Sequence, residues 1–367
     1  MIKRLFNRND NIAILIAGIF SIIIGLGVAR FAFTGLIPAM LDDYLTIKFV
    51  GILASLNFAG YLSGSIFSIF VKDINFKVYL YRFGIFLAIS TTFILAYSDN
   101  NTLWMIGRVL AGFAGAMCLI VGTSIVMQKL TIKSKTKAMG IHFSGIGFSI
   151  LTTDLLARFV LSLNYSWRDS WAVLAIFAII LSLYSVYILS FDKEVKQNAV
   201  KVKFDISIFT PFVIVLIIAY FTEGVGFVVQ ATFLPDIINN LKGLEGYGSL
   251  TWTLVGVAGI PSCIIWMLLA HRFGSSNIII IALLLQAVGI LIPAFSSNIY
   301  LNLLSGVLYG GTFIGLVALF MNLGGQLSRG NPVVLMGAMT SSYGIGQVIA
   351  PLYSVYFIEK YGNYDYS

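Results

Sequence analysis

Four ionisable side chains stand out within the long apolar stretches of this chain, where a charge is costly and therefore marks a candidate functional site. They are Arg30, Arg108, Asp154 and Glu223. An arginine in such a place can bind an anion or hold a carboxylate. A carboxylate there is costly while it is charged and can take up a proton. These residue types therefore suggest solute binding or proton transfer inside a membrane.

Two segments of the chain resemble each other. GVARFAFTGLIP begins at Gly27, and GVGFVVQATFLP begins at Gly224, which is 197 residues later. The same offset places Gly140 onto Gly337. Two distant pairs related by one offset predict two similar halves that follow each other in the same direction. A parallel-repeat membrane protein is commonly a transporter with its site between the halves.

Arg30 and Glu223 lie on the equivalent first helices of this repeat, which usually face each other across a central cavity. We therefore expect them to approach from opposite walls of a substrate site. Gln230, which corresponds to Phe33, is expected to add a hydrogen-bonding group, and Phe33 an aromatic contact. The alternatives are a static Arg30–Glu223 pair that holds the halves together, and ordinary packing for the aromatic ring.

Arg108 and Asp154 are interpreted as structural or coupling residues. Gly112 and Gly115 follow Arg108 at helical spacing, which lets another helix pack closely. Arg108 either bonds to backbone carbonyl groups or controls proton transfer. Asp154 has Arg158 four residues later on the same helix face, and this pair is interpreted as mostly structural.

The composition predicts an integral membrane protein. The chain is 59% hydrophobic and 10% charged, whereas a soluble domain carries about 25% charged residues. A membrane helix needs about 20 apolar residues, and eleven segments are long enough. Their approximate ranges are 11–38, 49–70, 78–97, 102–128, 138–161, 170–190, 207–235, 249–270, 276–295, 299–323 and 332–358.

Lysines and arginines gather in alternate loops. Sixteen of the 23 lie at the N-terminus or in the loops on its side of the membrane, five lie on the opposite side, and two lie within spans. This bias predicts a cytoplasmic N-terminus and, for eleven spans, an external C-terminus in a bacterial inner membrane. The net charge of +8 then needs no nucleic-acid partner, although the basic loops lie near anionic lipid.

The longest polar stretch after the N-terminus separates the two halves. We predict a six-helix half at 1–190, a cytoplasmic linker at 191–206 and a half with five spans at 207–367. The fold class is therefore an all-α membrane bundle of two parallel repeats, the second without its last helix. Cys118 and Cys263 lie within spans and are interpreted as small packing residues.

Several motifs together resemble the major facilitator superfamily. GRVLAGFAGA, with Arg108, resembles its fourth-helix motif, and LLAHRFG resembles the short basic motif after helix eight. GLGVARFAFTGLIPAM, YFTEGVGFVVQATFLPDI and HFSGIGFSI resemble the YbfB/YjiJ-type transporters. The resemblance implies twelve helices and transport by alternating access, with Arg30 and Glu223 in the signatures of helices one and seven. It implies no particular solute.

The sequence therefore favours a monomeric secondary transporter that moves a small solute together with protons and uses no metal or cofactor. Glu223 is the acidic residue expected near the centre of a cavity-lining helix, so it is the candidate proton carrier. The alternatives are a non-transporting or truncated membrane protein, and an integral-membrane enzyme. An enzyme would depend on His142 and Asp154, but twelve residues along one helix separate them by about 18 Å.

Overall fold

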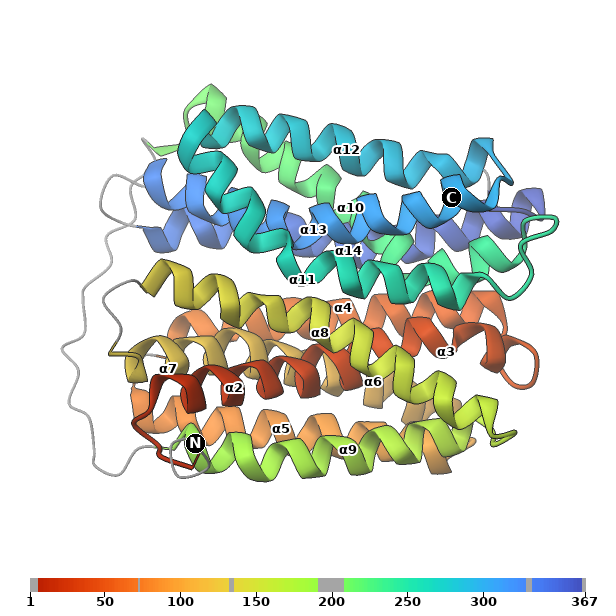
Figure 1. Ribbon diagram of the computed structural model, residues 1–367, viewed down its shortest axis with the longest axis horizontal. Coiled ribbons are helices and arrows are strands. Elements are labelled where there is room, and N and C mark those ends of the chain that lie inside the picture. The colour runs from red at the N-terminus through yellow and green to blue at the C-terminus, as the bar shows by residue number, and fades with distance from the viewer. Residues whose placement is uncertain (1–5, 72, 132–134, 191–207, 328–331, 365–367) are drawn as a thin grey trace.

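The computed structural model describes residues 6–71, 73–131, 135–190, 208–327 and 332–364. Their regular secondary structure is helical, and long helices run side by side along the molecule (Figure 1). In chain order these are α2 Asn11–Ile22, η1 Ile23–Phe31, α3 Ala32–Leu41, α4 Ile47–Phe70, α5 Ile74–Tyr97, α6 Asn101–Ala116, η2 Met117–Val121, α7 Gly122–Lys129, α8 Lys135–Ser162, α9 Trp167–Ile188, α10 Pro211–Asn239, α11 Gly248–Phe273, α12 Ser275–Phe295, α13 Ile299–Leu327 and α14 Pro332–Tyr361.

The predicted all-α membrane architecture is confirmed. Among the described residues, ten helices are long and apolar enough to cross a membrane. Two of these are composite, because α2, η1 and α3 form one continuous span and α6, η2 and α7 form another. The eleventh predicted segment is α14, which is 30 residues long but less apolar and is not among the ten.

Several of the helices begin at a polar residue whose side chain accepts a hydrogen bond from a free amide of the first turn. Such a cap replaces a bond that the helix itself cannot make. Ser166 at the start of α9 forms a reciprocal cap with Asp169. The other side-chain caps are Asp10, Thr46, Asp73, Asn100 and Thr210.

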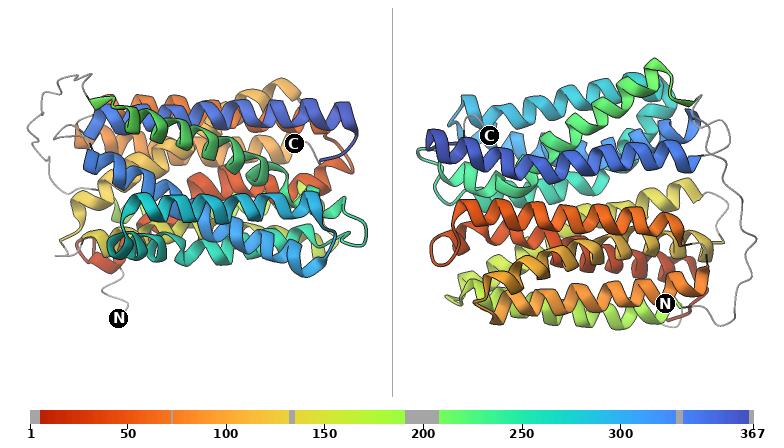
Figure 2. Two further views of the ribbon diagram at one scale, coloured as in Figure 1. Left: turned by 90° about the horizontal axis from the view of Figure 1, so that it is seen from above. Right: turned by 180° about the vertical axis from the view of Figure 1, so that it is seen from behind.

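The helices lie in two groups. α2–α9 form the lower group in Figure 1 and α10–α14 the upper group, and the view from behind shows the same separation (Figure 2). The groups meet where α8 packs on α11, α4 on α14 and α3 on α10. The predicted linker at 191–206 lies outside the described residues, so the division of the chain at 190 and 207 stays a prediction.

Glycine allows the two groups to approach closely at the α8–α11 contact. A Cβ atom built on Gly147 would lie 2.3 Å from the backbone nitrogen of Ile260, well inside contact distance. Gly256 on α11 is similarly close to the backbone of Leu151. Because backbone atoms form the contact, no side-chain rotation can make room, and any larger residue must push the helices apart.

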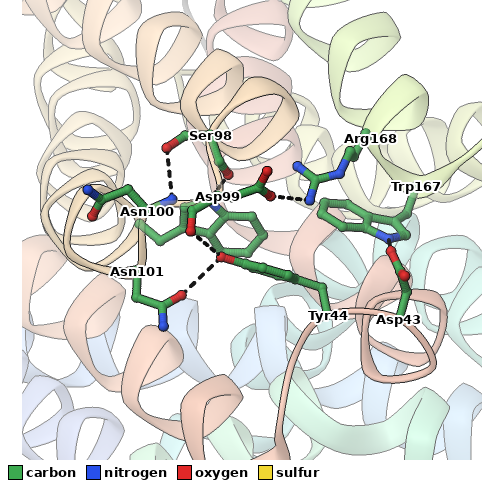
Figure 3. A network of polar contacts seen from close by, with 9 residues as sticks. Asp43, Tyr44, Ser98, Asp99, Asn100, Asn101, Trp167 and Arg168 are labelled. Carbon is green, nitrogen blue, oxygen red and sulfur yellow. Dashed lines mark hydrogen bonds and ion pairs between the residues drawn. The ribbon is translucent and has the colours of Figure 1, made fainter.

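At the end of the molecule opposite the N-terminus, a polar network joins three connections between helices (Figure 3). Arg168 forms an ion pair with Asp99, and Trp167 donates a hydrogen bond to Asp43 at 2.9 Å. Tyr44 donates to the Asp99 carbonyl at 2.8 Å, and burial together with the Asp99 charge raises the pKa of Tyr44. Tyr44 therefore stays protonated and can donate this hydrogen bond, which joins the segment after α3 to the segment after α5.

We predict that Gly147→Ala lowers the thermal stability of the purified protein by about 1–3 kcal/mol, the usual effect of overpacking. Gly311→Ala is the matched control, because a Cβ there would meet just Ala258, at 3.9 Å. Melting temperatures measured in one detergent test this. Equal melting temperatures for the two variants would contradict a tight α8–α11 contact.

Candidate functional site

The equivalent first helices of the two groups meet at equivalent residues. The Thr34 hydroxyl on α3 donates a hydrogen bond to the Ala231 carbonyl on α10, and these residues are 197 positions apart. Both helices also contain a proline, Pro38 and Pro235, at the same offset. The repeat seen in the sequence is therefore also present in space, and the crossing of α3 and α10 locates the centre of the candidate site.

Arg30 lies near the end of η1, a nine-residue π-helix within the first span. Such segments interrupt α-helices at single places and are frequent at functional sites. η1 packs on η2, the second π-segment, so closely that a Cβ on Gly25 would lie 2.3 Å from the Cβ of Cys118. Cys118 is a free, buried thiol in this contact, as expected for a packing residue.

The Arg30 guanidinium is surrounded by aromatic rings. It is 9% exposed, and its Cζ atom lies 4.2 Å from the centre of the Phe58 ring, 5.3 Å from Tyr61 and 5.6 Å from Phe227. Cation–π attraction of this kind stabilises a buried guanidinium without using its N–H groups. The Nε and Nη2 atoms accordingly have no hydrogen-bond partner.

Arg108 has a different environment. Its Nη1 donates to the Ala29 carbonyl at 3.1 Å and its Nε to the Leu53 carbonyl at 3.4 Å. Its guanidinium lies 4.3 Å from the centre of the Phe33 ring. The geometry thus agrees with the alternative in which Arg108 bonds to backbone carbonyl groups, and it places Phe33 against Arg108.

A small cavity of about 10 Å³ lies between the two groups of helices. Such a volume holds about one water molecule. The residues that line it come from α3, α4, α6, η1 and α10, and include both buried arginines. They are Arg30, Phe33, Thr34, Ala54, Asn57, Phe58, Arg108, Ala231 and Thr232.

Glu223 is buried, with 3% exposure, but it faces α12 and does not pair with Arg30. Its Oε1 accepts a weak hydrogen bond from Gln286 at 3.5 Å, and its Oε2 has no partner. Gln230 also faces α12, where its Nε2 donates to the Ile290 carbonyl at 3.3 Å. The structure therefore does not join Arg30 and Glu223, and the static pair considered from the sequence is absent from this conformation.

A cluster of aromatic rings extends from Phe227, which lies beside Arg30, to Tyr220, which lies on the same helix as Glu223. The ring of Tyr220 lies 4.5 Å from that of Tyr343, and Phe227 contacts both Tyr343 and Tyr309. Tyr309 and Tyr343 lie within electrostatic reach of both Arg30 and Glu223. Sequence reasoning did not single out these two among the 18 tyrosines of the chain, although Tyr343 lies between Ser341 and Gly344, which match Ser144 and Gly147 at the same offset of 197.

Asp154 connects the two groups through Thr253 on α11. The Thr253 hydroxyl donates a hydrogen bond to Asp154, and Arg158 donates to the same hydroxyl at 2.9 Å. The expected contact of Asp154 with Arg158 is therefore replaced by a three-residue chain. Asp154 Oδ1 and the indole nitrogen of Trp252 remain without hydrogen-bond partners.

We predict that Thr253→Val lowers stability by about 1–3 kcal/mol, because it leaves a buried carboxylate without its donor. Asp154→Asn in the same background should then cost less than it does alone, since the two residues share one interaction. Thermal unfolding of the two single variants and the double variant measures this coupling. Additive losses would show that the bridge contributes nothing.

Comparison with known proteins agrees with this architecture. Residues 22–367 match the family described as the uncharacterised MFS-type transporter YbfB, where MFS denotes the major facilitator superfamily. The nucleoside transporter NupG superposes with a TM-score of 0.69 at 15% identity, covering 98% of this chain and 94% of its own, and a NupG mutant reaches 0.72 at 13%. A bacterial homologue of the human lysosomal transporter Spinster, inward-facing and unoccupied, gives 0.67 at 15% identity and covers 96% and 85%.

Proposed function

Since the chain belongs to the YbfB-type transporters of the major facilitator superfamily, we propose that it is a secondary active transporter that moves a small solute by alternating access. The observation that carries this proposal is the presence of two buried, incompletely bonded ionisable groups, Arg30 and Glu223. Charged groups are kept inside a membrane bundle mainly where they bind or carry something. The solute named for NupG is not transferred, because 13–15% identity shows the fold alone.

The arrangement of the helices supports a rocking motion of the two groups. Their contacts follow α8–α11 on one side and α4–α14 on the other. Several of these contacts are glycine against backbone, as at Gly147, and few polar bonds would have to break on separation. The Thr34–Ala231 bond lies between them at the helix crossing. In our proposal, separation at either end opens the cavity beside Arg30 to that side of the membrane.

Glu223 is the residue that we propose couples solute transport to the movement of protons. Its Oε2 has no partner and its Oε1 has a single long hydrogen bond, so few contacts favour the charged form. In the closed conformation we propose that the carboxyl group carries a proton. Hydration on opening stabilises the carboxylate and releases the proton. Because Arg30 does not contact Glu223 here, a change in helix packing, with Tyr309 and Tyr343 between them, must link solute binding to protonation.

We predict that Arg30→Ala and Glu223→Gln each abolish transport while folded protein still accumulates in the membrane. Neither side chain makes the strong bonds on which folding depends, since Arg30 Nε and Nη2 and Glu223 Oε2 are unpartnered. Solute uptake by proteoliposomes and the yield of monodisperse protein give the two measurements. Normal activity per molecule at reduced yield would assign both residues a purely structural role.

A pH gradient tests the coupling. We expect that an imposed gradient drives solute accumulation by the parent protein and drives none by Glu223→Gln. Asp154→Asn serves as the control, because Asp154 is also a buried acid but is bonded to Thr253. Gradient-driven accumulation that persists in Glu223→Gln would exclude this residue as the proton carrier.

The orientation in the membrane can be tested independently. We propose a bacterial inner membrane with the N-terminus in the cytoplasm, from the charge bias of the loops. In intact cells, a membrane-impermeant thiol reagent should label Lys242→Cys and leave Asn9→Cys unlabelled. Both positions are exposed, whereas Cys118 and Cys263 are buried and give little background. The reverse labelling pattern would invert the proposed topology.

A further inference from the structure

We propose that the cavity between Arg30 and Arg108 binds the carboxylate of a small organic anion, and that this anion is the transported solute. The proposal rests on the proposed transport function and adds the chemical class of the solute. It also gives Arg108, which bonds to backbone carbonyl groups, a second role as a fixed positive charge beside the site.

The first argument is uncompensated charge. Arg30 and Arg108 line the same cavity and lie within electrostatic range of each other. Among the described residues, no carboxylate lies within 4.0 Å of either guanidinium, since Glu223 faces α12 and Asp154 is bonded to Thr253. Two neighbouring cations inside a membrane bundle are costly without a counter-charge. A bound anion would supply that charge.

The second argument is the geometry of the unpartnered atoms. The N–H bonds of Arg30 at Nε and Nη2 lie on the same edge of the guanidinium and point in parallel directions. These are the two atoms without hydrogen-bond partners. A carboxylate accepts two parallel N–H groups at once, which makes this edge a specific carboxylate-binding surface. The aromatic rings beside the guanidinium accept no hydrogen bond from this edge, so its two N–H groups keep their capacity to donate.

The other residues that line the cavity indicate which chemical groups the rest of the solute carries. Ala54, Phe58 and Ala231 give the cavity apolar walls, and Phe227 lies beyond them beside Arg30. Asn57 Oδ1 has no hydrogen-bond partner and can accept a bond from a hydroxyl or ammonium group. At about 10 Å³ the cavity is too small for such a solute in this conformation, so α10 must move away from α3 and α4 for it to enter.

Benzoate and benzamide are suitable probes, because they share a ring and a planar head group but differ in charge. At constant ionic strength, benzoate should raise the melting temperature of the purified protein and benzamide should not. Arg30→Gln should weaken the apparent affinity for benzoate about tenfold or more, and Arg30→Lys should restore part of it. Arg158→Gln is the matched control, because Arg158 is also in a span but bonds to Thr253 and does not line the cavity.

Equal stabilisation by benzamide, or equal loss of the benzoate effect in Arg158→Gln, would overturn the proposal. Stabilisation by chloride as strong as that by benzoate would overturn the carboxylate assignment.

Uptake assays separate this inference from the transport function. If benzoate stabilises the protein in an Arg30-dependent way but proteoliposomes transport no carboxylate, the anion site stands and the assignment of the anion as the transported solute fails. If a neutral solute is transported and no carboxylate binds, the anion site fails alone.

Discussion

A guanidinium buried without a counter-ion is the constraint to which the surrounding structure responds. Arg30 cannot be solvated by lipid, so Phe58, Tyr61 and Phe227 surround its face and lower the cost of its charge. These rings come from α4 and α10, which belong to different groups of helices. The same contacts that accommodate the charge therefore also join the groups, and any separation of the groups changes the environment of Arg30.

The contacts between the groups are of a kind that permits such separation. At Gly147 and Gly256 the backbones of α8 and α11 come into close contact. Specific hydrogen bonds across the boundary are few and local, as at Thr34–Ala231, Ser55–Val348 and Thr253–Asp154. Close packing of this kind is favourable when the two helices are aligned and is lost when they shift relative to each other. This favours two discrete arrangements over a gradual deformation.

The sequence predicted the helices and their equivalence better than it predicted the direction of the side chains. Charge cost identified Arg30 and Glu223, and the repeat placed them on helices whose crossing is seen at Thr34 and Ala231. An offset fixes the level of a residue along the membrane but not its angle around the helix. Glu223 therefore turned out to face Gln286. The π-helix at Arg30 adds to this difference, because a wider turn rotates the residues that follow it. The residues GVARF contain no pattern that predicts this π-helix.

The separation of Arg30 from Glu223 has a mechanistic consequence. If the two charges were paired, loss of the proton from Glu223 would be balanced locally by Arg30, and binding of an anion would compete directly with the carboxylate. Here the ring of Tyr343 stacks on that of Tyr220 and contacts that of Phe227, and Phe227 lies beside Arg30. Tyr309 donates its hydroxyl hydrogen to the Phe227 carbonyl at 3.0 Å, which ties α13 to the helix that carries Glu223. A movement of α10 that admits solute beside Arg30 must therefore disturb the packing around Glu223 as well, so the shared helix can couple the two sites without direct contact between the charges.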